Sequence, residues 1–348
     1  MHAQATGFNF WEGSALNSAL ANANGAKARD ASVQAMVPAS ITQLKMPIIT
    51  ASITHYQVDT DYKIFGNETE YSVANPIPSG FFSAPINDDW YFGLAIHSRA
   101  AADISVPSII LVHPDETRLK PITVSIAPTI AYKAENISIA LTGEYLVSEH
   151  ELHQTQCRFN RCETEIETGN ASGVSGAVSA TWQINNLASV ALMHRFDAQL
   201  KNNEIDISLP AITSIYTTIE LVKKLDLDLS YSLSRWKGKG IKFTNYSDVL
   251  GLLQGYQDSN RFAAGLEYKI EDWFLRAGFS SDEAIDPLGG YDKRYRIGAG
   301  YQATSNINLN LSAFKEIYAI KKFSTNDVDL VRVQNKGQGL SLGMSYQF

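Results

Sequence analysis

The sequence has 348 residues, a formal net charge of −7 and a slightly negative mean hydropathy of −0.14. An acidic balance without a basic face excludes nucleic acid as a partner. No stretch reaches the roughly 18 apolar residues that a spanning helix requires. This excludes a helical membrane protein but not a membrane barrel, in which apolar and polar residues alternate.

The first 45 residues are distinct from the rest. They are rich in Ala, Asn and Ser, and the triplet AQA at residues 3–5 has the form of a signal-peptidase site, so residues 1–5 are interpreted as a signal-peptide remnant. Short helical turns are expected at 14–22 and 30–36, the second capped by Asp30. We expect this segment, called the hatch below, to fill a polar lumen as a plug. A disordered tail is the alternative.

From residue 46 onward, apolar and polar residues alternate with period two. LDLDLSYSL (225–233) places Leu and Tyr on one side and Asp and Ser on the other, and GLSLGMSYQF continues the pattern to Phe348. Successive side chains of a strand point to opposite faces, and two aspartates facing a protein core would carry a heavy desolvation cost. The polar face is therefore expected to be wet and the apolar face to meet lipid.

Tight polar turns alternate with longer links along this region. Six tight turns and seven longer links join about fourteen strands, an even number that is typical of an outer-membrane barrel. The longer links are expected near 59–72, 102–121, 148–174, 200–209, 237–257, 282–292 and 319–337. The predicted fold class is therefore all-β, with a transmembrane antiparallel β-barrel over residues 46–348 and a short helical plug in its lumen.

Barrel closure explains a strand at the carboxyl end, because the last strand has to pair with the first. Aromatic residues near the proposed strand ends predict an interfacial girdle. These residues are Trp90, Tyr91, Trp182, Trp236, Trp273 and Tyr301. The alternative is a soluble β-sandwich with ordinary core aromatics, which would bury many polar faces.

Several motifs resemble the FadL/TodX (OmpP1) family of outer-membrane channels for long-chain fatty acids and other hydrophobic compounds. They are GFNF, ARDAS and VPASITQLK in the hatch, APINDDWYFGLAI at the third strand, and then ALMHRFDA, GYQDSNRFAAG, YDKRYRIGAG and SYQF. The resemblance extends in order over nearly the whole chain. It implies a fourteen-stranded barrel, substrate capture in an apolar groove at the outer loops, an internal apolar pocket, and lateral exit through the wall at a kinked third strand.

The sequence also departs from the family pattern. The Asn-Pro-Ala of the family's hatch is Val37-Pro38-Ala39 here, although Asp30, Ala31 and Ser32 match the rest of the hatch motif. The glycine expected near the third-strand kink falls at about Ala101. The basic residue that the family places after the fifth strand's tyrosine is Val147, so its carboxylate clamp cannot be transferred.

On the third strand, alternation from Trp90 directs Tyr91, Gly93, Ala95, His97 and Arg99 inward. The small residues Gly93 and Ala95, together with Ala101, are expected to leave room at the lateral opening. Arg99 with His97 is a candidate site for a carboxylate head group through charge-assisted hydrogen bonds. Neutralisation of a wall acid such as Asp103 by Arg99 is the alternative.

Other candidate substrate-binding residues lie elsewhere in the chain. Arg195 and Arg261 match basic positions of the family, and structural ion pairs inside the barrel are the alternative role. Phe8, Phe10 and Trp11 in the hatch are expected either to line the apolar end of a ligand pocket or to pack on the inner wall.

One stretch offers four residues of types that ligate zinc, namely His150, His153, Cys157 and Cys162. Thiols on an outer loop normally oxidise. A Cys157–Cys162 disulfide is therefore expected, and no metal.

The predicted function is passive uptake of long-chain fatty acids or other hydrophobic small molecules, without cofactor or enzymatic activity. The alternatives are a hydrocarbon-specific channel of the same family and a non-transporting porin-like or adhesive barrel. No activated-serine or protease signature is found in the sequence. We expect a monomer in the Gram-negative outer membrane that contacts lipid, lipopolysaccharide and the barrel assembly machinery, with the hatch accessible from the periplasm.

Overall fold

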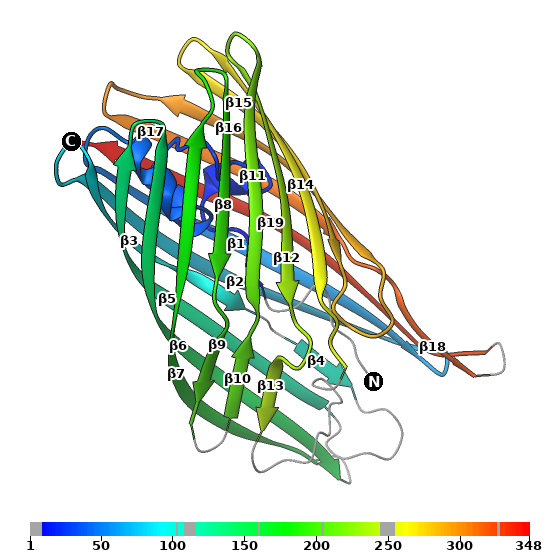
Figure 1. The fold of residues 1–348 in the computed structure, drawn as a ribbon. Coiled ribbons are helices and arrows are strands. Elements are labelled where there is room, and N and C mark those ends of the chain that lie inside the picture. Colours follow the sequence, from blue (N-terminus) through cyan, green and yellow to red (C-terminus); the bar gives the residue numbers. More distant parts are fainter. Residues whose placement is uncertain are drawn as a thin grey trace.

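A computed structural model describes residues 9–101, 104–107, 116–158, 161–202, 205–243, 255–325 and 328–348. Its strands form one antiparallel sheet that closes into a fourteen-stranded barrel (Figure 1). Closure is made by the first and last strands, which pair from Ile48–Gln347 to Ile64–Val331. The fold class predicted from the sequence is confirmed.

The wall strands are numbered in chain order with their extensions. They are β1 (Ile48–Ile64), β2 (Asn67–Pro85), β3 (Trp90–Ala101), β5 (Glu116–Ala134), β6 (Ile137–Arg158), β7 (Arg161–Gln183), β8 (Ala188–Arg195), β11 (Ala211–Val222), β12 (Leu225–Arg235), β14 (Ser259–Ile270), β15 (Trp273–Glu283), β16 (Tyr291–Gln302), β17 (Ile307–Ile317) and β19 (Val328–Gln347). Short extensions are β4 (Ile104–Pro107), β9 (Ala198–Lys201), β10 (Ile205–Leu209), β13 (Gly240–Phe243) and β18 (Lys321–Thr325).

The wall is apolar outside and polar inside, the reverse of a soluble protein. On β19, Leu342 is 53% exposed whereas Ser341 is fully buried. The Ser341 hydroxyl is within hydrogen-bond distance of Thr54 on β1, at 2.8 Å. Period-two alternation therefore presents an apolar surface to lipid while the polar side chains satisfy one another within the barrel.

The six tight turns all lie at one end of the barrel, which we call the turn end, and the opposite end is the loop end. Asn87 and Asn185 each accept hydrogen bonds from backbone N–H groups two and three residues later. Such Asx turns reverse the chain within a few residues. Short polar sequences thus fix the turn end.

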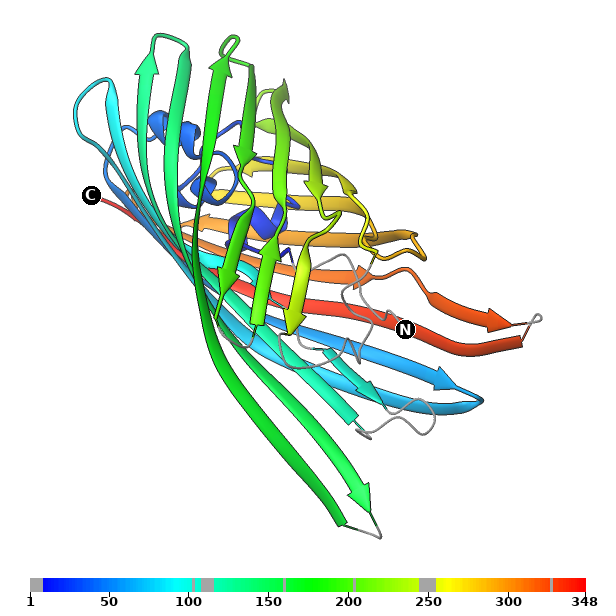
Figure 2. The same ribbon diagram turned by 60° about the horizontal axis from the view of Figure 1, so that its bottom comes forward.

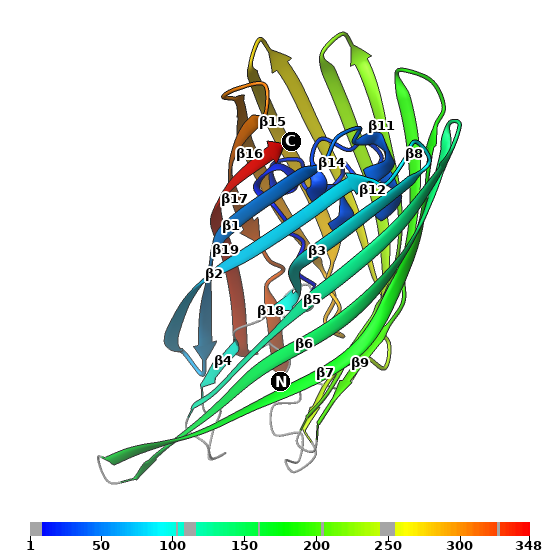
Figure 3. The same cartoon turned by 90° about the vertical axis from the view of Figure 1, so that its left-hand side faces the viewer.

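Four of the predicted long links, at 59–72, 148–174, 200–209 and 319–337, were wrong, because most of their residues lie in strands. Residues 59–72 are mostly strand, because β1 and β2 continue to a turn at Phe65 and Gly66 with positive φ. Residues 148–174 are also mostly strand, since β6 and β7 pair out to Arg158–Arg161, and Figures 2 and 3 show this hairpin projecting beyond the barrel. Polar residues on both faces suit a strand surrounded by water, so polarity alone did not mark a loop.

The predicted girdle holds for four of its six aromatics. Trp90, Trp182, Trp273 and Tyr301 are exposed on the outside, between 38% and 50%. Tyr91 and Trp236 are buried inside instead. Alternation had already placed Tyr91 inward, and Trp236 directly follows β12 and continues its inward-facing series after Ser232 and Ser234.

The hatch lies inside the barrel near the turn end, as Figures 1 and 3 show in blue. It contains α1 (Ala15–Ala19) and the 3-10 helices η1 (Ala31–Ala35) and η2 (Pro38–Gln43). Asp30 caps η1 through Ser32 N–H, as predicted, whereas η2 was not foreseen. None of the described helices has the length and apolar character needed to cross a membrane.

Candidate functional site

The candidate site begins where β2 and β3 separate. Their ladder runs only from Pro85–Tyr91 to Gly80–Ile96, although β2 remains paired with β1 from Ser83 to Asn67. Pro76 and Pro78 lie on the stretch of β2 beyond the ladder. Proline has no backbone N–H to donate to a neighbouring strand, so it is tolerated where β2 does not pair with β3. The described strands thus leave a gap between β2 and the loop-end half of β3.

A bulge in β3 lies beside this gap. Ser98 pairs with Val124 and Ala100 with Thr123, so Arg99 is an extra residue with no partner on β5. Alternation stops here, because the four residues from His97 to Ala100 are all buried. A bulge redirects side chains and bends its strand, so β3 is expected to bend at Arg99.

The first described residues of the hatch lie along the bulged edge of β3. Asn9 forms a β-bridge with Ala100, and Phe10 N–H donates to the Arg99 carbonyl at 3.5 Å. The Ser79 hydroxyl of β2 donates to the Gly13 carbonyl at 2.7 Å. Residues 9–13, which we call the stopper, therefore contact both strands that border the gap.

Five of the eight predicted substrate-binding residues line one cavity between the stopper and the wall. They are Phe10, Trp11, His97, Arg99 and Arg195. The cavity has a volume of about 30 Å³, enough for about two water molecules. A long-chain ligand exceeds this volume, so the stopper has to move for such a ligand to pass.

The other three candidates lie elsewhere. Tyr91 packs in an apolar cluster with Val33 and Ile41 of the hatch. Arg261 is ion-paired with Asp282 at 3.1 Å and its guanidinium lies 4.5 Å from the centre of the Trp11 ring, which agrees with the structural alternative. Phe8 lies outside the described residues, as do residues 1–5 and Asp103.

Charged groups within the barrel surround the cavity. Glu144 on β6 is fully buried, with Oε1 3.1 Å from Arg195 Nε and Oε2 3.8 Å from Arg99 Nε. Arg195 also donates through Nη2 to the Ala35 carbonyl of the hatch at 3.1 Å. In the described part of the chain, Arg99 Nε and Nη2 and His97 Nδ1 are buried and make no hydrogen bond. Such groups are costly unless a ligand or water pairs with them.

An apolar cluster lies on the loop-end side of this site. It joins wall residues such as Leu146, Leu200 and Leu209 to Trp236 and Tyr256. The Trp236 and Tyr256 rings meet edge to face with centroids 6.1 Å apart. The route from the loop end to the charged site is therefore lined by apolar side chains.

The predicted small residues of β3 face the hatch. A Cβ atom on Gly93 would collide with the Gln34 amide, so only glycine permits this close approach. Ala95 is buried against Ala31, whereas Ala101 is half-buried at the end of β3. The kink falls at Arg99, two residues before the position expected for it.

The hatch motif anchors the hatch to the wall. Asp30 accepts from the Ser345 hydroxyl at 3.0 Å and from Ser32. Ala31 N–H donates to Thr50, and Ala39 N–H donates to Ser179 at 2.9 Å. Pro38 is the first residue of η2. Its ring fixes the backbone dihedral that a first helical turn needs, and it has no N–H that would require a partner.

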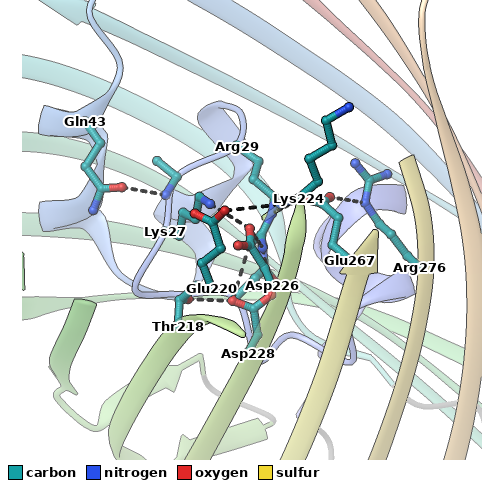
Figure 4. A network of polar contacts seen from close by, with 12 residues as sticks. Lys27, Arg29, Gln43, Thr218, Glu220, Lys224, Asp226, Asp228, Glu267 and Arg276 are labelled. Carbon is teal, nitrogen blue, oxygen red and sulfur yellow. Dashed lines mark hydrogen bonds and ion pairs between the residues drawn. The ribbon is translucent and has the colours of Figure 1, made fainter. Parts of the chain in front are cut away.

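A charged cluster at the turn end fixes the hatch more strongly, and sequence reasoning missed it (Figure 4). Arg29 donates to Asp226 at 3.1 Å, Asp228 at 2.9 Å and Glu267 at 2.6 Å. Lys27 contacts Asp226 and Arg276 contacts Glu267, each at 2.6 Å. The aspartates of LDLDL were expected to be wet, but Asp228 is fully buried because Arg29 pairs with it. In the sequence, only the two inward-facing aspartates Asp226 and Asp228 indicated that a basic partner lies inside the barrel.

Hatch and wall also border an open cavity of about 470 Å³ at the turn end, lined by Lys27, Arg29 and Arg276 among others. In the hatch, burial alone would raise the pKa of Glu12, but the charges of Arg296, Arg294 and Arg261 together outweigh it and hold that pKa below its ordinary value. Burial would likewise lower the pKa of Arg29, but Asp228 and its neighbours raise it. Both groups therefore stay charged near neutral pH.

The loop-end hairpin carries the cysteines. Cys157 on β6 and Cys162 on β7 form a disulfide. No group of three or more His, Cys, Asp or Glu suited to a metal ion is found among the residues that the structure describes.

Comparisons with known proteins agree with this architecture. The family model described as outer membrane protein transport protein (OMPP1/FadL/TodX) matches residues 1–190 and 175–348. The crystal structure of a Pseudomonas aeruginosa FadL homologue is 16% identical and superposes with a TM-score of 0.83, covering 99% of this chain and 100% of that one. The Pseudomonas putida toluene transporter TodX is 14% identical, with a TM-score of 0.77 and coverage of 97% and 99%. The Ralstonia pickettii toluene transporter TbuX is 14% identical, with a TM-score of 0.70 and the same coverage. No curated protein sequence matches the chain.

Proposed function

The chain belongs to the OMPP1/FadL/TodX family of outer-membrane transport proteins, and on this premise we propose that it carries long-chain fatty acids inward by passive diffusion. As in the family, its place is the Gram-negative outer membrane and its cargo is hydrophobic. Substrate would enter at the loop end, pass the apolar cluster, and leave sideways between β2 and β3. The barrel would act as a monomer surrounded by lipid and lipopolysaccharide.

The short β2–β3 ladder is the observation that carries the proposal. The gap beyond Gly80–Ile96 lies directly beside the cavity at Arg99, and the stopper contacts both of its borders, at Ala100 and Ser79. Lateral exit suits a molecule that prefers lipid to water, because it avoids crossing an aqueous lumen.

The fixed hatch supports the same route. Arg29 with Asp226, Asp228 and Glu267 holds the hatch to β12 and β14 at the turn end, and residues 30–34 are buried beneath the cavity. Axial passage would require breaking these buried ion pairs, whereas lateral passage requires only displacement of the stopper. The hatch therefore closes the axial path.

The charged site favours a carboxylate over a neutral hydrocarbon. Arg99 lines the cavity with buried N–H groups that make no hydrogen bond, and a carboxylate oxygen is the acceptor that a guanidinium pairs with best. A hydrocarbon would leave these donors unpaired. Two structural relatives are nevertheless named toluene transporters, so aromatic hydrocarbons are the second candidate substrates.

The experiment measures uptake of radiolabelled oleate and toluene by cells that lack their own fatty-acid channel and express this barrel. Deletion of Arg99 removes the bulge and should restore a continuous strand, which closes the gap. Arg99→Ala is the matched control, because it removes the charge and keeps the chain length. We expect deletion to abolish uptake of oleate, and Arg99→Ala to reduce it while preserving a bent strand.

Outer-membrane amounts and heat-modifiable migration on gels control for barrel assembly. Wild-type uptake by the deletion variant would refute lateral exit at β3. Toluene uptake without oleate uptake by the natural sequence would assign the protein to hydrocarbons, and uptake of neither would point to a porin-like or adhesive barrel.

A further inference from the structure

Glu144 occupies the place that a bound carboxylate would take beside Arg99. Its side chain is fully buried between two guanidinium groups, but its distances to them are unequal, 3.1 Å to Arg195 and 3.8 Å to Arg99. Neither carboxylate oxygen makes a well-oriented hydrogen bond within the described chain. Glu144 is therefore a buried acceptor that is only partly paired with the two arginines.

The charges around the site do not cancel. Arg99 and Arg195 contribute two positive charges and Glu144 one negative charge, while Arg195 has a second acceptor in the Ala35 carbonyl. Arg99 is the less satisfied partner, because its Nε and Nη2 lack hydrogen bonds. A buried excess charge is unfavourable unless an anion compensates it. The cavity touches both arginines and His97, so an anion in it could pair with the N–H groups of Arg99 that make no hydrogen bond.

We propose that Glu144 is a built-in competitor for the substrate carboxylate and sets how tightly the channel holds its cargo. This inference rests on the proposed fatty-acid transport and names the substrate class as long-chain monocarboxylates. An incoming carboxylate pairs with Arg99 and displaces the longer contact of Glu144 Oε2, while Glu144 Oε1 stays with Arg195. Competition from Glu144 keeps the affinity low enough for release, as conduction requires of any site along a channel.

The test measures, by calorimetry, the binding of oleate and of its neutral methyl ester to the purified barrel. Glu144→Gln removes the competing charge but keeps the shape. One additional charge-assisted hydrogen bond corresponds to an affinity gain of about 10- to 100-fold. We expect oleate to bind more tightly by this factor, methyl oleate to be unchanged, and oleate release to slow. Glu220→Gln, at the turn end, is the control and should match the natural sequence.

The gain in oleate affinity should depend on Arg99. Glu144→Gln is therefore expected to leave oleate affinity unchanged when it is added to an Arg99→Gln variant. If Glu144→Gln does not assemble, Glu144→Asp retains the charge, withdraws it from Arg99, and should tighten oleate binding by a smaller factor. Unchanged or weaker oleate binding in the assembled variants overturns the role of Glu144. Absence of oleate binding by the natural sequence would instead overturn the proposed function, so the two failures are distinguishable.

Discussion

Replacement of Arg29 by glutamine should release the hatch from the wall at the turn end. In the natural sequence, Lys27, Arg29 and Arg276 balance Asp226, Asp228 and Glu267 (Figure 4). Arg29→Gln leaves this cluster with one excess negative charge, located chiefly on Asp228, whose side chain is fully buried.

The magnitude follows from that burial. Breaking one buried ion pair costs about 3–5 kcal/mol, which weakens hatch docking by a factor of about 100 or more. Lys27→Gln is the matched control, because its side chain is 43% exposed, and an exposed pair contributes only about 0.2–1 kcal/mol.

The assay is ion conductance of the purified barrel in planar bilayers, with hydrogen exchange of the hatch amides measured in parallel. Arg29→Gln should raise both, and Lys27→Gln should leave both near the natural level. Asp228→Asn added to Arg29→Gln removes the excess charge and should restore a closed hatch. If Arg29→Gln conducts and exchanges like Lys27→Gln, the ion pairs do not hold the hatch and this reasoning is refuted.

Further tests concern the stopper, the hatch contact and the hairpin. Because the pKa of Glu12 is lowered by Arg296, its contribution to docking is complete above the ordinary pKa of 4.5 and is lost as the pH falls through the lowered value. Stopper hydrogen exchange should therefore rise only in acid, and Glu12→Gln should abolish this pH dependence. Gly278→Ala would place a Cβ 2.7 Å from backbone atoms of the hatch and should lower the thermal midpoint, whereas Gly80→Ala, which has open space, should not. Cys157→Ser opens a loop with a sequence separation of only 5, so it should cost at most about 2 kcal/mol locally, detected as proteolysis of the hairpin without loss of uptake.

The period-two pattern was sufficient to predict the wall and which side of each strand faces lipid. Residues such as Leu342 and Ser341 follow it, because lipid outside and polar contacts inside impose alternation along most of the wall, although it stops at the bulge of β3. It could not distinguish a hydrated loop from a hydrated strand, and the β6–β7 hairpin was therefore mistaken for a link.

The candidate site was predictable only in part. His97 and Arg99 were found because they lie on one strand with a known direction, but Glu144 was not found, because nothing in its neighbourhood of the chain indicates contact with Arg195, which is more than fifty residues away in the sequence. Asp226 and Asp228 were correctly placed inward and wrongly judged wet for the same reason. Alternation predicts which face of the sheet a side chain is on. Its partner across the lumen is determined by how the whole barrel closes, which the local sequence does not reveal.

The ion pairs of Arg29 also constrain the order of assembly. Arg29 lies 197 to 238 residues before Asp226, Asp228 and Glu267 in the chain. Contacts between such distant residues form late, because the intervening chain has to be ordered first. The hatch precedes every wall strand in the chain, yet it cannot acquire these partners until β12 and β14 are in place. In a barrel caught midway, the hatch would be undocked and Asp226 and Asp228 would lack their basic partners, whereas Glu267 could still pair with Arg276. Docking of the hatch would therefore indicate that the barrel is complete.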